Sequence, residues 1–121
     1  MRLLCADDDP DIRAILALAL GVDPGITATV LGSGGELVEA ARAHGADAIL
    51  LDAMMPDQDG FETCRQLKAD PATAHIPVLF LTATSQATER ERALALGARA
   101  CLAKPFDPMT LAATVRAALV S

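Results

Sequence analysis

The sequence has 121 residues, 52% of them hydrophobic, and a formal net charge of −6 at pH 7. This length and composition suit one domain with a sizeable buried core, and the acidic balance argues against direct binding to nucleic acid or an anionic membrane. Three widely spaced cysteines form neither a disulfide framework nor a Cys-x-x-Cys motif, and no apolar run has the length of a signal peptide or a transmembrane helix, so we expect a cytoplasmic protein.

Five short apolar runs alternate with five segments of helical periodicity. The runs typical of strands are residues 2–6, 26–31, 48–51, 78–81 and 100–103. The segments with apolar residues three and four positions apart, as in one-sided helices, are 11–20, 36–43, 60–68, 88–96 and 108–119. Strict alternation predicts a parallel sheet with helices on both faces, which is a doubly wound α/β fold in one domain over residues 1–121.

Glycine and proline support these boundaries. Gly21, Gly45 and Gly97 follow or end predicted helices, where a C-cap favours glycine. Pro10 and Pro108 stand at predicted helix starts, where the missing N–H of proline costs nothing. The Gly-Ser-Gly-Gly stretch at residues 32–35 lacks the Gly-Lys-Ser/Thr ending of a phosphate-binding loop. We therefore expect a plain loop there.

Polar residues follow four of the five predicted strands. Asp7, Asp8 and Asp9 follow the first strand, Asp52 the third, Thr82 the fourth and Lys104 the fifth. In an open α/β sheet, ligands bind at the carboxyl ends of the strands, which meet at one edge. The sequence therefore predicts a single site at this edge that contains carboxylates, a hydroxyl and an ammonium group.

The carboxylates at this edge indicate a metal site. Crowded carboxylates raise one another's pKa unless a cation joins them, and hard divalent cations prefer such oxygens. Magnesium also accepts phosphate oxygens, which suits phosphoryl transfer. Structural interpretations remain open for single residues: Asp9 before Pro10 is typical of a helix N-cap, and Asp7 and Asp8 are equally typical of a solvated turn.

Together these motifs resemble the receiver domains of two-component response regulators, and the resemblance spans the whole chain. It rests on Asp7-Asp8, Asp52, Thr82 and Lys104-Pro105-Phe106, on segment 49–60, which is similar to the family's phosphoacceptor segment, and on segment 80–83, which is similar to its switch strand. The resemblance implies a flavodoxin-like (βα)5 sandwich with strand order 2-1-3-4-5. It also implies a function in two-component phosphorelay signalling.

The resemblance assigns roles to individual residues. It implies that Asp52 accepts a phosphoryl group from a histidine kinase or a histidine phosphotransfer protein. The cofactor would be Mg²⁺, held by Asp8, Asp52 and the backbone carbonyl of Met54, while Asp7 would act mostly through bound water. Such a domain promotes its own phosphoryl transfer and dephosphorylation and is not an enzyme with a separate substrate.

The remaining roles concern the response to phosphorylation. Lys104 would pair with a phosphoryl oxygen through a chain turn that contains a cis Lys104–Pro105 peptide bond, and the Thr82 hydroxyl would move toward the phosphoryl group. Cys101 stands where many receiver domains have Tyr or Phe, three residues before the lysine. The aromatic switch is therefore absent, and we expect residues 83–86 and the start of the following helix to carry the signal.

Output and partners follow from the resemblance only in outline. An output domain after residue 121, a separate partner protein and a homodimer formed on phosphorylation all remain open. Two other functions are also open. One is a docking module that no longer takes phosphate. The other is an aspartyl-phosphate phosphatase of the haloacid-dehalogenase type, which needs a second acid where this chain has Met54.

Overall fold

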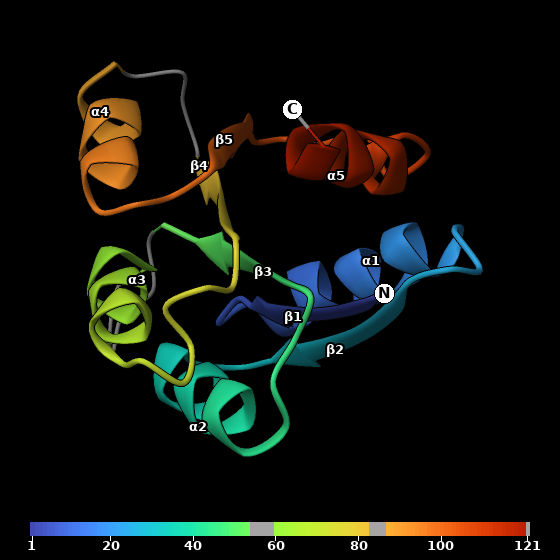
Figure 1. The fold of residues 1–121 in the computed structure, drawn as a ribbon. Coiled ribbons are helices and arrows are strands. Elements are labelled where there is room, and N and C mark those ends of the chain that lie inside the picture. The colour runs from blue at the N-terminus through green and yellow to red at the C-terminus, as the bar shows by residue number, and fades with distance from the viewer. Residues whose placement is uncertain (54–59, 83–86, 121) are drawn as a thin grey trace.

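A computed structural model describes residues 1–53, 60–82 and 87–120 of the protein. Strands and helices alternate along the chain (Figure 1). In order they are β1 (Arg2–Ala6), α1 (Pro10–Gly21), β2 (Thr27–Leu31), α2 (Gly34–His44), β3 (Ala48–Asp52), α3 (Gly60–Ala69), β4 (Val78–Thr82), α4 (Ala87–Ala95), β5 (Ala100–Ala103) and α5 (Leu111–Val120). Within the described residues, no helix is both long enough and apolar enough to cross a membrane.

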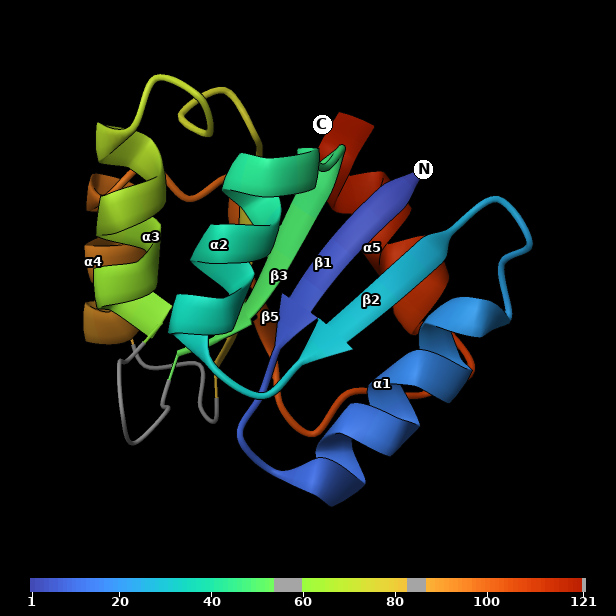
Figure 2. The same ribbon diagram turned by 90° about the horizontal axis from the view of Figure 1, so that it is seen from below.

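The five strands form one parallel sheet in the order β2-β1-β3-β4-β5. This confirms the predicted doubly wound fold and its strand order. Figure 2 shows that the arrowheads of β1 and β2 point to the same edge of the sheet. Because all strands run in parallel, their carboxyl ends share this edge, which we call the rim.

Alternate residues of the central strands point to opposite faces of the sheet, and both faces are covered (Figure 1). Leu4 of β1 and Ile49 of β3 belong to a core under α2, α3 and α4, whereas Leu3 and Leu50 belong to a second core under α1 and α5. Burial on both faces explains why β1, β3 and β4 read as continuous apolar runs. The packed sheet holds the rim residues at fixed positions.

Two helix starts are capped by side chains. The Asp9 carboxylate accepts a hydrogen bond from the Asp11 N–H, and Pro10 is the first residue of α1, so the predicted N-cap is confirmed. Ser33 caps α2 in the same way by accepting from the Glu36 N–H. The expectation of a plain loop at residues 32–35 is therefore wrong, because a serine hydroxyl here starts a helix in which Gly34 is already helical.

The predicted C-caps hold at two of three glycines. Gly45 and Gly97 have φ values of 69° and 98°, in the left-handed region that glycine enters without a steric penalty. Gly21 differs, because it is the last residue of α1 and Val22 is the C-cap with an ordinary right-handed conformation. The helix end therefore lies one residue later than predicted, at Gly21 instead of Leu20.

The last helix begins later than predicted. Residues 108–110 form a turn, in which the Asp107 carboxylate accepts from the Met109 N–H, and α5 starts at Leu111. The Asp107 carbonyl accepts from the N–H groups of both Thr110 and Leu111, so a hydrogen-bonded turn precedes the helix. Pro108 therefore lies in this turn and does not begin the helix as predicted.

Candidate functional site

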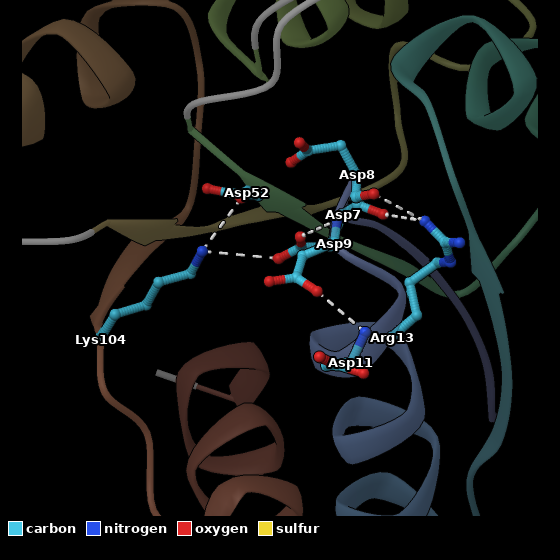
Figure 3. A network of polar contacts seen from close by, with 7 residues as sticks. All are labelled: Asp7, Asp8, Asp9, Asp11, Arg13, Asp52 and Lys104. Atoms are coloured by element: carbon cyan, nitrogen blue, oxygen red, sulfur yellow. Dashed lines mark hydrogen bonds and ion pairs between the residues drawn. The ribbon is translucent and has the colours of Figure 1, made fainter.

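Three carboxylates from two neighbouring strands meet at the rim (Figure 3). Asp7 follows β1 and is 1% exposed, Asp52 ends β3 and is 6% exposed, and Asp8 lies at the surface. One carboxylate oxygen from each of the three lies within 4.8 Å of the others. The order β1-β3 in the sheet makes this possible, since residues 45 positions apart in the sequence end adjacent strands.

Lys104 brings a cation to the two buried carboxylates. Its Nζ lies 3.0 Å from Oδ2 of Asp52 and 3.4 Å from Oδ2 of Asp7 (Figure 3). The Lys104 N–H donates to the Thr82 carbonyl at 2.7 Å, which ties the residue after β5 to the end of β4. The peptide bond between Lys104 and Pro105 is cis, as predicted.

Burial and mutual repulsion set the electrostatics of the site. Burial raises the pKa of Asp7, and the nearby Asp52 charge raises it further, against the lowering effects of the Asp9 N–H and Lys104. Burial lowers the pKa of Lys104, but its hydrogen bond to Asp52 and the charges of Asp52 and Asp7 outweigh this, so the pKa is raised overall. Three carboxylates against one ammonium leave the cluster short of positive charge.

The three consecutive aspartates after β1, Asp7 to Asp9, have two different structural roles. The Asp9 N–H donates to Oδ1 of Asp7 at 3.0 Å, which orients the Asp7 carboxylate. The Asp9 carboxylate turns instead to the start of α1 as its N-cap. Of the three consecutive aspartates, only Asp7 and Asp8 therefore belong to the carboxylate cluster.

Thr82 and Cys101 lie where the sequence predicted them. Thr82 is the last residue of β4 and its side chain is buried, next in the sheet to the end of β3. Cys101 lies on β5, half-buried against the core under α2, α3 and α4, and burial raises the pKa of its thiol. The two residues thus lie on neighbouring strands, β4 and β5, in which Thr82 pairs with Ala103 and Cys101 pairs with Phe80.

Gly60 is a site residue that sequence reasoning missed. It begins α3, and its N–H donates to the Ala53 carbonyl at 3.1 Å. A Cβ atom at this position would lie 2.3 Å from the carbonyl oxygen of Asp52 and 3.0 Å from Cε1 of Phe80. Only glycine allows α3 to approach the backbone of Asp52 so closely. A glycine at a predicted helix start was the available signal, but it does not reveal a close contact.

Arg13 on α1 was also missed. Its Nη1 donates to the backbone carbonyls of Asp7 and Asp8, at 3.0 Å in each case (Figure 3). The sequence shows only an arginine near the start of a helix, and nothing in that pattern predicts a contact with the chain segment before the helix. Two predicted features, the Met54 carbonyl and the signalling segment 83–86, lie outside the described residues.

An apolar hollow of about 360 Å³ opens beside Lys104, between the first half of α1 and the chain that leads into α5. Ile12 and Ile15 line it on one side, and Pro105, Phe106 and Pro108 line it on the other. Leu18 near the end of α1 and Val22, just after it, are 76% and 57% exposed. The rim is therefore flanked by a surface to which another protein could add apolar contacts.

Comparison with known proteins identifies the chain's relatives. Residues 3–116 match the protein family described as "Response regulator receiver domain". The DNA-binding response regulator MtrA of Mycolicibacterium smegmatis is 36% identical over 118 residues, which cover 98% of this chain and 50% of MtrA. The response regulator PleD of Caulobacter vibrioides is 41% identical over 115 residues, which cover 95% of this chain and 25% of PleD. The chain thus spans half or less of these relatives.

Solved structures agree over nearly the full chain. The chemotaxis protein CheY4 of Vibrio cholerae has a TM-score of 0.89 at 29% identity, covering 97% of each chain. The receiver domain of the sensor histidine kinase PA1611 from Pseudomonas aeruginosa has a TM-score of 0.86 at 28% identity, covering 99% of this chain and 98% of that one. The latter structure has a magnesium ion coordinated in its active site cleft.

Proposed function

Because the chain belongs to the receiver domain family of two-component response regulators, which signal by phosphorylation, we propose that Asp52 is its phosphoacceptor. The observation that carries this proposal is the position of the Asp52 carboxylate, which is buried at the rim within 3.0 Å of the Lys104 ammonium and beside Asp7 and Asp8. Among the described residues, Asp7 is also buried at the rim near Lys104, but it lies farther from Nζ, at 3.4 Å, and its Oδ1 accepts a hydrogen bond from the Asp9 N–H.

The proposed reaction is a direct phosphoryl transfer to Asp52. A carboxylate oxygen forms a bond to phosphorus as the P–N bond of a phosphohistidine breaks, and the electron pair of that bond returns to the imidazole nitrogen. The transition state spreads negative charge over the phosphoryl oxygens, so positioning and fixed cations matter most. Lys104 supplies one such cation. Its Nζ lies 3.0 Å from Oδ2 of Asp52, so the ammonium can pair with an oxygen of the new phosphoryl group.

The donor set of the rim fits Mg²⁺. Three carboxylates with oxygens within 4.8 Å of one another, one of them on an exposed residue, suit a hard divalent cation that keeps several waters. When bound, the ion would neutralise the incoming phosphoryl oxygens and the excess carboxylate charge. Asp8 and Asp52 would hold it directly and Asp7 through water, and the backbone carbonyl of Met54 completes the proposed set. The magnesium site of the PA1611 receiver domain supports this assignment.

The proposed response to phosphorylation begins at Thr82. Its side chain is buried at the end of β4, beside β3, and its carbonyl is already tied to the Lys104 N–H. A hydroxyl that moves toward the phosphoryl group from this position would pull on the chain that leads to α4. We keep residues 83–86 as the proposed carrier of the signal, and Cys101 is too small to replace the aromatic side chain of other receivers.

The proposed partners follow from the family. A histidine kinase or a histidine phosphotransfer protein would supply the phosphoryl group, and the apolar hollow between Ile12, Ile15 and Phe106 offers it contacts next to Lys104. Residues 1–121 would act as one receiver domain in the cytoplasm, where the three free cysteines stay reduced. The output would be a further domain or a partner protein. A further domain is suggested by the DNA-binding name of MtrA and by the greater lengths of MtrA and PleD. A homodimer would be one mode of control.

The test is the intact mass of the protein after incubation with Mg²⁺ and acetyl phosphate. We expect a single phosphoryl adduct in the wild type, no adduct in Asp52→Ala, and a strongly reduced adduct in Asp8→Asn or in excess chelator. Asp9→Asn is the matched control, because asparagine caps helices well and Asp9 lies outside the cluster. An unmodified wild type would favour the docking module that takes no phosphate. An adduct that persists in Asp52→Ala would place the acceptor elsewhere.

A further inference from the structure

The chain segment between β1 and α1 carries two of the proposed metal ligands and is held by one side chain. Nη1 of Arg13 donates to the carbonyls of both Asp7 and Asp8 (Figure 3). The two N–H groups of one guanidinium nitrogen therefore bridge consecutive peptide units. This contact fixes the backbone that places one buried and one exposed carboxylate at the rim.

The surroundings of Arg13 are shaped for this contact. A Cβ atom at Gly32, after β2, would lie 3.3 Å from Nη1 of Arg13 and 3.7 Å from its Cζ. The Gly32 N–H donates to Oε2 of Glu36, so the glycine backbone is itself anchored beside the guanidinium. Among the described residues, no carboxylate lies within ion-pair distance of Arg13. The guanidinium is committed to backbone carbonyls and not to a neighbouring acid.

We propose that Arg13 is a positioning residue of the cation site, which sets the spacing of the Asp7 and Asp8 carboxylates by holding both of their carbonyls. This inference rests on the proposed function, in which these carboxylates bind Mg²⁺. The inference predicts the direction in which Mg²⁺ affinity changes when Arg13 is removed. If Arg13 acted only through its charge, its removal would make the rim more negative and tighten Mg²⁺ binding. If it positions the ligands, its removal weakens binding.

The first experiment compares Mg²⁺ affinity in two arginine variants, measured by titration of amide chemical shifts. Arg13→Gln should weaken binding about tenfold or more, as is usual when a residue that orients metal ligands is lost. Arg2→Gln is the matched control, since Arg2 also donates from Nη1 to a carbonyl, that of His44, but at the opposite end of β1. Arg2→Gln should leave the affinity close to that of the wild type. At saturating Mg²⁺ the Arg13→Gln protein should regain its rate of phosphorylation by acetyl phosphate, which a general loss of structure would not allow.

A second pair of variants keeps every charge. Gly32→Ala pushes a methyl group against the Arg13 guanidinium, whereas Gly35→Ala in α2 meets no atom within 4 Å. Gly32→Ala should weaken Mg²⁺ binding, by less than Arg13→Gln, and Gly35→Ala should not change it. This pair decides the matter if Arg13→Gln does not fold.

The possible outcomes separate this inference from the proposed function. Wild-type protein that binds no Mg²⁺ would overturn both. Wild-type binding with equal or tighter binding in Arg13→Gln would overturn the positioning role alone, and so would equal affinities of Gly32→Ala and Gly35→Ala.

Discussion

The two ends of the parallel sheet treat charge in opposite ways. At the amino ends of the strands, charged groups find partners within the chain: Arg116 pairs with Asp23, and Lys68 donates to the carbonyls of Ala74 and Ile76. At the carboxyl ends, Asp7 and Asp52 share a single ammonium, that of Lys104, and Asp8 adds a third carboxylate to the cluster.

This difference shows that the carboxyl ends of the strands are less favourable electrostatically than the amino ends. At the amino ends, the ion pair and the hydrogen bonds of the charged side chains stabilise the loops without a bound ion. Crowding at the carboxyl ends raises the pKa of Asp7 through burial and repulsion, so the folded state holds that charge at a cost. Proteins commonly accept such local instability at a site that a ligand completes. Here the ligand is the proposed cation.

The largest expected effect comes from a change in the backbone packing of the rim. Gly60→Ala forces a methyl group to within 2.3 Å of the Asp52 carbonyl oxygen unless α3 moves. We expect the free energy of unfolding, measured with urea, to fall by about 3 kcal/mol, at the upper end of overpacking effects. Gly35→Ala, a helical position with open space around it, should gain about 0.5 kcal/mol. Equal effects at the two glycines would show that the rim is not tightly packed.

Asp7→Asn tests whether the rim carries an energetic cost. Asparagine keeps an acceptor for the Asp9 N–H but removes a buried charge beside Asp52. We expect Mg²⁺ affinity to fall at least about tenfold, while the unfolding free energy in Mg²⁺-free buffer rises by on the order of 1 kcal/mol. Asp23→Asn at the other end should lose stability and keep its Mg²⁺ affinity, because it breaks a pair with Arg116. A stability loss in Asp7→Asn would contradict the proposed cost.

Lys104→Ala removes the only cation that touches the buried carboxylates among the described residues. Mg²⁺ should bind severalfold more tightly, because the ammonium no longer competes for the oxygens of Asp7 and Asp52. The variant should still fold and bind the ion, but it should lose the amide shifts that beryllofluoride, a phosphoryl mimic, produces in α4 of the wild type. Wild-type shifts in the variant would remove Lys104 from the proposed switch.

The smallest effect is a pH dependence at the amino ends. The Ala72 N–H and then Arg42 lower the pKa of Asp70 below its ordinary value of 3.8. Asp70 therefore contributes stability that is present above the unfolded pKa and is lost as pH falls through the lower folded pKa. The stability difference between wild type and Asp70→Asn should be constant from pH 7 to pH 5, should begin to shrink near the ordinary pKa of 3.8, and should be lost once the pH falls below the lower folded pKa. A difference that already shrinks between pH 7 and pH 5 would contradict this.

The order of elements and the composition of the rim could be predicted because their signals are local. Each buried strand is a short apolar run, and Asp52 or Lys104 follows its run directly. Ser33 and Pro108 were misjudged because the same residues start helices in one context and turns in another, and the choice depends on nearby hydrogen bonds. Gly60 and Arg13 could not be found, because their importance comes from atoms that approach only after folding.

The position of β1 in the sheet has a consequence for the local stability of the strands. Since β1 lies between β2 and β3, the first 52 residues contain every strand of a three-stranded unit, β2-β1-β3, whereas β4 and β5 add to one side in chain order. The strands β1 and β3 are interior and largely buried, whereas β5 is an edge strand whose residues are half-buried or exposed. We therefore expect the amides of β1 and β3 to resist hydrogen exchange longest and those of β5 to exchange through local opening. The half of the domain that is proposed to report phosphorylation is then also the half that can open without unfolding the rest.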